Sequence, residues 1–460
     1  MNKLQTKTNA FYTEIVSLRK TSRGALAESS LLRYFTFSSL YGAQGIPEGL
    51  TFFAIPAWMA MQGKSPAEIG SFIGVIGIPW SFKILIAPIM DRYTLLAMGR
   101  KRPWVLLGQL GLVISLLCAS FINDPLNNLS LLMVAGFFIS FFGAFQDVAV
   151  DGMAIDIVPI PEQARANGLM WGSKTIGTSL SLVTCTWIIN RYDFHYAPIF
   201  LAFIIGCIFI IPLLLKENIG EKILPWSKGE ACKRSKEMQV HSLTIIFKNL
   251  IKVFILPTSL IMGVAAFIIS IGDGLMDALL PVFTIQKIGW TDSTFSQVMA
   301  IANITAGVLG MFVGGALVDF FGKIRMMSIY LVLLITLILV MFVFRTYWNS
   351  QFLVPGFIIC YCTMMTFLKI AIFATAMELC WKRISATQFT LYMAISNLGR
   401  AAGAGYLGEI KNYFVAWEYV FLVFAVTAIL MLSLLTFIKT EKHLLSVNRL
   451  ENRHAVPEKN

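Results

Sequence analysis

The chain has 460 residues, of which 57% are hydrophobic and only 13% are charged, and its formal net charge is +12. With a mean hydropathy of +0.72 it is too apolar for a soluble protein of this length, which excludes soluble enzymes and soluble nucleic-acid-binding proteins. We therefore interpret the chain as a polytopic membrane protein.

Twelve apolar segments follow one another along the chain, separated by short polar turns. A helix that spans a bilayer needs about 20 mostly apolar residues, and each segment is long enough. The predicted helices cover residues 33–60, 67–90, 103–122, 129–157, 164–190, 195–215, 252–286, 293–320, 325–345, 351–380, 386–411 and 415–439. The expected fold class is an all-α membrane protein.

Lys and Arg residues are concentrated in the two tails and in every second loop. The loops on the other side carry only Lys64, Arg191, Lys287, Arg345 and Lys411. Because positively charged loops stay in the cytosol, we expect both termini there. The net charge is then a signal of topology, with anionic lipid headgroups as counterions, and does not indicate nucleic-acid binding.

A polar linker between the sixth and seventh helices divides the chain into two sets of six. It runs from Lys216 to about Lys248 and contains both acidic and basic residues. The predicted regions are a cytosolic tail over 1–32, a six-helix bundle over 33–215, a cytosolic linker over 216–251, a second six-helix bundle over 252–439, and a cytosolic tail over 440–460.

The two halves match each other at a nearly constant spacing. Glu48-Gly49-Leu50 and Asp273-Gly274-Leu275 are 225 residues apart, and Asp156 precedes Glu378 by 222. An ordered set of such pairs indicates an internal repeat. Two pseudo-symmetric, parallel six-helix halves are the architecture of the major facilitator superfamily, with the substrate held at mid-membrane between them.

Two motifs resemble those of known families. The loop Asp91-Arg92 … Gly99-Arg100-Lys101-Arg102 is similar to the loop signature of that superfamily, and the residues from Asp319 to Arg325 form a degenerate copy. The run Gln146-Asp147-Val148-Ala149-Val150-Asp151-Gly152 resembles the AmpG-type muropeptide permeases and their relatives, the acetyl-coenzyme A transporters. This resemblance implies proton-linked import of anhydromuropeptides across the inner membrane for cell-wall recycling.

Carboxylates inside the predicted helices are the candidates for proton coupling. Asp147 and Asp151 are four residues apart and therefore share one helix face. Glu48 and its repeat partner Asp273 form a second acidic set. Ionisable groups at membrane depth are functional by default. The alternatives are helix packing for the first pair and a glycine-rich helix break that serves gating for the second.

Four cations within predicted helices are the candidates for binding an anionic substrate: Lys83, Lys174, Lys369 and Arg400. Lys369 stands 222 residues after Asp147, so the repeat predicts an ion pair between these two residues across the centre of the protein. Trp171 and Gln146 are expected to contact the sugar part of a substrate. Snorkelling lysines and interfacial tryptophans are the alternative interpretations.

Charged residues near the cytosolic helix ends form a predicted gating latch. We expect salt bridges between loop cations and helix-end acids to hold the outward-open state, whereas ordinary headgroup contacts are the alternative. The residues are Asp91, Arg92, Arg100, Asp156, Asp319, Arg325 and Glu378.

The preferred hypothesis is a monomeric, proton-coupled secondary transporter of anhydromuropeptide-like anions that needs no cofactor or metal. Transport of acetyl-coenzyme A or another nucleotide-like anion on the same fold is the first alternative. A membrane enzyme acting on a lipid-linked substrate is the second, but the histidines His195, His241, His443 and His454 lie in loops or tails, which argues against it.

Overall fold

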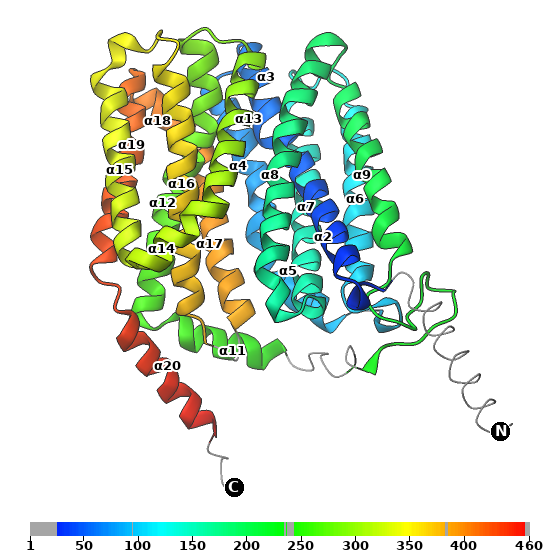
Figure 1. Ribbon diagram of the computed structural model, residues 1–460. Coiled ribbons are helices and arrows are strands. Elements are labelled where there is room, and N and C mark those ends of the chain that lie inside the picture. Colours follow the sequence, from blue (N-terminus) through cyan, green and yellow to red (C-terminus); the bar gives the residue numbers. More distant parts are fainter. Residues whose placement is uncertain (1–24, 94, 234–235, 237–242, 382–384, 456–460) are drawn as a thin grey trace, which may run out of the picture.

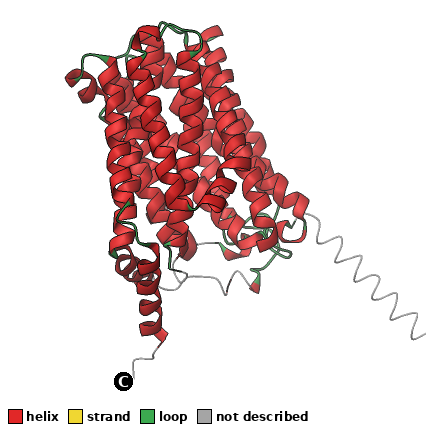
Figure 2. Cartoon of the chain, turned by 60° about the vertical axis from the view of Figure 1, so that its left-hand side comes forward, coloured by secondary structure: helices red, strands yellow, loops and turns green. Residues whose placement is uncertain are grey.

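The computed structural model describes residues 25–93, 95–233, 236, 243–381 and 385–455. Within these ranges the chain is helical apart from turns, loops and an isolated parallel bridge between Ala25 and Lys216 (Figure 2). An all-α membrane fold is what the composition predicts.

The N-terminal bundle consists of six spanning helices, two of which are interrupted. In chain order, its elements are α2 (Ser30–Glu48), η2 (Gly49–Ala54), α3 (Ile55–Met61), α4 (Pro66–Gly77), η3 (Ile78–Phe82), α5 (Lys83–Arg92), α6 (Arg102–Ser120), α7 (Leu129–Ile157), α8 (Ile160–Arg191) and α9 (Tyr196–Leu214). Here α2, η2 and α3 form the first spanning helix, and α4, η3 and α5 form the second.

The C-terminal bundle repeats this plan and adds a short helix at each end. Its elements are α11 (Leu243–Phe254), α12 (Pro257–Val282), η5 (Phe283–Lys287), α13 (Asp292–Leu309), η6 (Gly310–Gly314), α14 (Gly315–Phe321), α15 (Lys323–Val343), α16 (Leu353–Glu378), α17 (Ser385–Gly405), α18 (Leu407–Tyr413), α19 (Trp417–Leu435) and α20 (Thr440–Ala455).

The seventh spanning helix begins later than the sequence predicts. Residues from 252 onward are expected in one helix, but α11 ends at Phe254 and α12 starts at Pro257. Leu256 has an extended backbone with ψ 135°, as proline requires of the residue before it. Pro257 therefore opens a new helix, and its missing N–H costs nothing at that position.

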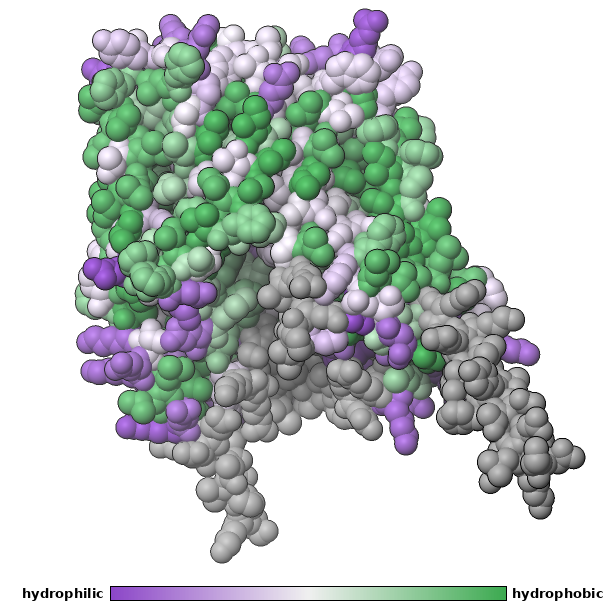
Figure 3. Space-filling view, viewed as in Figure 1, coloured by the Kyte–Doolittle hydropathy of each residue, from purple (hydrophilic) through white to green (hydrophobic). Residues whose placement is uncertain are grey.

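Apolar side chains form a belt around the molecule, with hydrophilic residues at both ends (Figure 3). Among the described residues, nine helices are long and apolar enough to cross a membrane. The first, fifth and eleventh spanning helices are of similar length but fall outside this group. Their lower hydropathy reflects the polar groups that they carry toward the centre.

Glycine contacts show the repeat directly in the packing. A Cβ on Gly49 would lie 2.3 Å from the backbone oxygen of Thr178, and one on Gly274 would lie 1.8 Å from that of Arg400. Both glycines allow the first helix of a bundle to cross its fifth at close range. The glycines are 225 residues apart and their partners 222, which are the two offsets found in the sequence.

The two bundles stand side by side, and α2 begins on the same side as α11 and α20 (Figure 1). We call this the terminal side and the other the distal side. The bundles contact each other mainly through α4 with α17 and through α8 with α13.

Hydrogen bonds join the bundles at the distal side. Gln286 donates to the backbone oxygens of Lys64 at 2.7 Å and Ala60 at 3.1 Å. Asn190 donates to Asp292 at 2.8 Å. These bonds connect the two bundles on the distal side.

Candidate functional site

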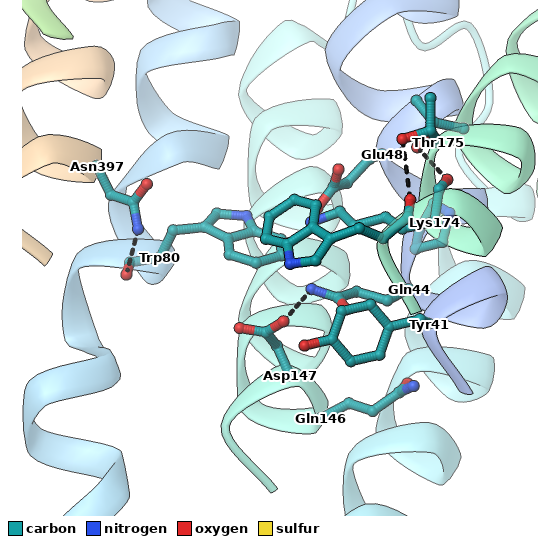
Figure 4. A network of polar contacts seen from close by, with 12 residues as sticks. Tyr41, Gln44, Glu48, Trp80, Gln146, Asp147, Lys174, Thr175 and Asn397 are labelled. Carbon is teal, nitrogen blue, oxygen red and sulfur yellow. Dashed lines mark hydrogen bonds and ion pairs between the residues drawn. The ribbon is translucent and has the colours of Figure 1, made fainter. Parts of the chain in front are cut away.

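The centre of the N-terminal bundle contains a buried carboxylate that has two donors. Asp147 on α7 accepts a hydrogen bond from Lys83 on α5. It accepts a second one from Gln44 on α2 (Figure 4). The side chains of Lys83 and Asp147 are only 6% and 7% exposed. A buried ion pair of this kind is stable only with such additional hydrogen bonds.

One helical turn further along α7, Asp151 accepts a hydrogen bond from the hydroxyl group of Tyr41. Tyr41 lies on α2, so α2 supplies a donor to each of the two carboxylates. Of the two α7 carboxylates, only Asp147 forms an ion pair with a cation of the described residues, namely Lys83. The pair therefore carries one negative charge more than its immediate partner balances.

A second ion pair lies above the first in the same bundle. Lys174 on α8 is 2.8 Å from Glu48 at the end of α2. Its ammonium group also lies 5.3 Å from the ring centre of Trp171 and 5.2 Å from that of Trp80. The N-terminal network is therefore edged by aromatic rings, which attract cations through their faces.

The C-terminal bundle holds a separate network around α12. Asp273 is 2.7 Å from Lys369 on α16 and accepts a weak hydrogen bond from Tyr361 at 3.4 Å. Asp277 is 2.5 Å from Arg400 on α17. Two carboxylates thus face two cations in this bundle.

The predicted proton-coupling residues fall into both networks. Asp147, Asp151 and Glu48 lie in the N-terminal bundle, and Asp273 lies in the C-terminal bundle. The four predicted cations all pair with these acids or with Asp277. Their roles in transport stay predictions, but the structure gives each of the four cations an acidic partner, and Asp151 a hydrogen bond from Tyr41.

The ion pair predicted across the centre, between Asp147 and Lys369, is replaced by two pairs within the bundles. Asp147 binds Lys83 and Lys369 binds Asp273. The repeat places the backbones of the two residues in equivalent positions, but each side chain finds a partner on a neighbouring helix first.

Two predicted substrate contacts differ in their exposure. Gln146 is fully buried and donates to the backbone oxygen of Leu40 at 3.0 Å, so in this conformation it joins α7 to α2. Trp171 is 53% exposed and lies edge-on to Tyr41, with ring centres 6.4 Å apart. Trp171 is thus exposed and Gln146 is enclosed in this conformation, and their contacts with a substrate stay predictions.

The predicted latch residues form pairs inside each bundle. Arg100 donates to both carboxylate oxygens of Asp156 at 2.9 Å, and Lys323 is 2.7 Å from Glu378. Each pair joins residues of one bundle. Their role in holding the outward-open state stays a prediction.

The remaining latch candidates lie at the surface of the terminal side. Arg92 is exposed, with its guanidinium 5.3 Å from the ring centre of Tyr93. Asp319 and Arg325 are exposed and form no ion pair with another residue of the described ranges. The side chain of Asp91 lies outside the described part of the chain.

Sequence reasoning missed Glu217, which follows α9 in the linker. Its buried carboxylate accepts the backbone N–H groups of Arg100 at 2.8 Å, Lys101 at 2.7 Å and Arg102 at 2.5 Å. Burial, with the nearby charge of Glu221, raises the pKa of Glu217 to about 7 although the three N–H groups favour its charged form.

The side chain of Arg102 completes this contact between loop and linker. It donates to the backbone oxygens of Pro212 and Leu213 at 2.7 Å, and to those of Lys222 and Ile223 at 2.8 Å. It thereby satisfies carbonyls at the end of α9 that have no partner within the helix.

Comparisons with known proteins agree with this geometry. The family model described as "Major Facilitator Superfamily" matches residues 37–404. The anhydromuropeptide permease of Escherichia coli (strain K12) is 26% identical over 397 residues, which cover 84% of this chain and 75% of the permease. A Rickettsia conorii protein named as transporter AmpG 4 is 25% identical over 429 residues, covering 89% and 97% of the two chains.

Among solved structures, the nucleoside transporter NupG superposes with a TM-score of 0.64. The match covers 88% of this chain and 98% of NupG at 15% sequence identity. At that identity, the likeness concerns the fold alone.

Proposed function

The chain belongs to the major facilitator superfamily, and from this premise we propose that it imports anhydromuropeptide-like anions together with protons. Its relatives are named permeases and transporters, so the chain is a multi-pass membrane transporter and not an enzyme. We further propose that it works as a monomer in the inner membrane, with the terminal side in the cytosol because Lys and Arg are concentrated there.

The single observation that carries proton coupling is the arrangement of Asp147 and Asp151. The two carboxylates lie on adjacent turns of α7, where Asp147 is buried and holds the ion pair with Lys83, and Asp151 is half-buried beside Tyr41. One proton on either carboxylate balances the charge of this group. A protonated Asp147 releases Lys83, so the proton changes the contacts between α5 and α7.

The anionic solute is assigned to the cations of the C-terminal bundle. The side chains of Lys369 and Arg400 are 43% and 34% exposed, whereas their carboxylate partner Asp273 is 6% exposed. An exposed cation on a buried acid can accept a solute carboxylate without first breaking a fully buried pair. Trp171 offers an aromatic face for a sugar ring.

The proposal is tested by uptake of labelled anhydromuropeptide into proteoliposomes with an imposed proton gradient, with and without an uncoupler. We expect accumulation that the uncoupler abolishes. Absence of accumulation contradicts the substrate, and accumulation that resists the uncoupler contradicts the proton coupling. Labelled acetyl-coenzyme A, tested in parallel, is expected to stay outside. Its accumulation in place of the muropeptide would favour the nucleotide-like alternative.

A further inference from the structure

Trp80 occupies the break in the second spanning helix. The segment η3 (Ile78–Phe82) is a 3-10 turn between α4 and α5, and Pro79 lies at its start. Lys83, which binds Asp147, is the first residue of α5 and directly follows this turn. Because Lys83 is bonded directly to the last residue of η3, a displacement of Lys83 also displaces the backbone of η3.

The indole ring of Trp80 contacts both ammonium groups of the N-terminal network. Nζ of Lys83 lies 4.7 Å from the ring centre and Nζ of Lys174 lies 5.2 Å from it. The indole N–H is buried and has no hydrogen-bond partner among the described residues. The position of this ring therefore depends on the two cations more than on any hydrogen bond of its own.

The backbone of Trp80 contacts the other bundle. Asn397 on α17 donates from its side-chain amide to the carbonyl oxygen of Trp80 at 3.1 Å (Figure 4). Asn397 precedes Arg400 by one turn, and the guanidinium of Arg400 lies 5.2 Å from the ring centre of Phe52 in η2. The helix α17 thus contacts the N-terminal bundle at both Asn397 and Arg400.

On the terminal side of this hydrogen bond, the two bundles contact each other through apolar side chains. Ile84 on α5 packs against a cluster that includes Trp381, Val253 and Val447 of the C-terminal bundle. Ile84 follows Trp80 by four residues, so the polar contact of η3 and the apolar contact of α5 with the other bundle lie about one helical turn apart.

We propose that Trp80 and Asn397 couple the charge of Asp147 to the contact between the bundles. When Asp147 is neutral, the ammonium group of Lys83 loses its ion pair. It then interacts with the ring of Trp80 and with Asp151. The altered position of Lys83 shifts the Trp80 carbonyl away from Asn397 and loosens α17. The inference rests on the proposed proton coupling and names its positioning residues.

All charged groups around Asp147 enter this step. Lys83 from α5 and Asp151 from the next turn of α7 are its closest neighbours, whereas Lys174 from α8 is held by Glu48 from α2. Because Glu48 retains Lys174, the released cation is Lys83. The Trp80 ring contacts both lysines, so its position depends on whether Lys83 is paired while Lys174 stays bound to Glu48.

The test is hydrogen–deuterium exchange of the full-length protein in detergent without substrate, read at peptides of α17 and α5. D147N mimics the protonated state and is expected to raise exchange around Asn397 by about fivefold, the lower bound of typical coupling between sites. In a Trp80→Leu or Asn397→Leu background, D147N is expected to have no further effect there, within about twofold. Trp80→Phe keeps a ring and should keep part of the effect.

Trp58→Phe is the matched control, because Trp58 lies in the same bundle but stacks on Phe194 at 5.3 Å, away from the charges. It should preserve the full response to D147N. An unchanged response in the Leu variants overturns the proposed coupling, as does a D147N protein whose α17 exchange equals that of the wild type. If Trp80→Leu does not fold, the effect of D147N on exchange is measured in Asn397→Leu and in Trp80→Phe instead. A full effect in Asn397→Leu then overturns the proposed coupling. The uptake assay with uncoupler reports on proton coupling separately.

Discussion

The two bundles share a backbone repeat but distribute their charges differently. The N-terminal bundle groups three carboxylates with two lysines, and its Lys83–Asp147 pair is almost fully buried. The C-terminal bundle balances two carboxylates with two cations, and both cations are partly exposed. The glycine crossings are conserved between the bundles even though position 147 carries an acid and position 369 a base.

This difference suggests how one ancestral fold can serve two tasks. A buried acid-rich group responds to protons, because a neutral carboxylate is favoured wherever water is excluded. An exposed, charge-balanced group responds to anions. The predictions below test whether proton response and solute binding are divided between the bundles in this way.

The largest effect is expected for Asp147→Asn. Asparagine cannot take up and release the proton, so we expect proton-driven accumulation to fall by about 100-fold, near the upper end of typical coupling between sites. Counterflow of labelled solute, which needs no proton gradient, should persist. Asp273→Asn is the matched change in the other bundle and should leave the response to the uncoupler intact. Loss of the response to the uncoupler in both variants would contradict the assignment of proton response and solute binding to different bundles.

The second prediction concerns the buried Glu217 of the linker, with the exposed Glu441 of α20 as its control. Its pKa is raised from 4.5 to about 7 by burial. Between these values the folded protein holds a proton that the unfolded chain has lost, so stability falls as pH rises from about 4.5 to 7 and is constant above. The shift is equivalent to about 3 kcal/mol.

Thermal unfolding in detergent at a series of pH values measures this effect. Glu217→Gln should remove the part of the pH dependence that lies between pH 4.5 and 7, whereas Glu441→Gln should preserve it. A wild-type slope that survives in Glu217→Gln would assign the pH dependence to another group.

The third prediction compares the glycine crossings. Alanine at Gly49 or Gly274 would place a Cβ against a backbone oxygen that cannot move alone, so each change should destabilise the protein by about 1–3 kcal/mol. Gly356 on α16 has nothing within 4 Å of its added Cβ. Gly356→Ala should therefore be neutral or stabilising in the same unfolding measurement. Unequal effects at Gly49 and Gly274 would mean that the repeat is not mechanically equivalent.

The smallest effect is expected for Lys369→Gln. A partly exposed ion pair with a solute contributes on the order of 1 kcal/mol, so the KM for the anionic solute should rise about fivefold while the pH dependence of uptake stays as in the wild type. Lys83→Gln is the counterpart in the other bundle and should alter the pH dependence. A changed pH profile in Lys369→Gln would link this cation to proton binding.

Much of the fold follows from hydropathy and from the internal repeat, because a bilayer demands long apolar helices. The late start of α12 was missed because Pro257 interrupts a stretch that is apolar on both sides. The crossings of the first helix with the fifth were not predicted, but they repeat at the two offsets seen in the sequence.

The members of the two charge networks were predictable, but their pairing was not. Ionisable residues inside apolar segments stand out in a sequence, whereas partner choice depends on helix rotation and side-chain reach. Lys83 lies 64 positions from Asp147, and no local pattern links them. Glu217 escaped notice because a carboxylate in a polar linker is typical of a solvated loop.

The polarity of three spanning helices has a consequence for biosynthesis. The first spanning helix carries Glu48, whose partner Lys174 lies on α8, and a charged residue at the centre of a helix costs about 2.5–3.5 kcal/mol on insertion. At about 5–20 residues per second, the ribosome needs on the order of 5–20 s to make the chain between Met61 and Ile160. During that interval Glu48 lacks its partner Lys174, so retention of the first helix in the bilayer depends on the insertion machinery until α8 is made.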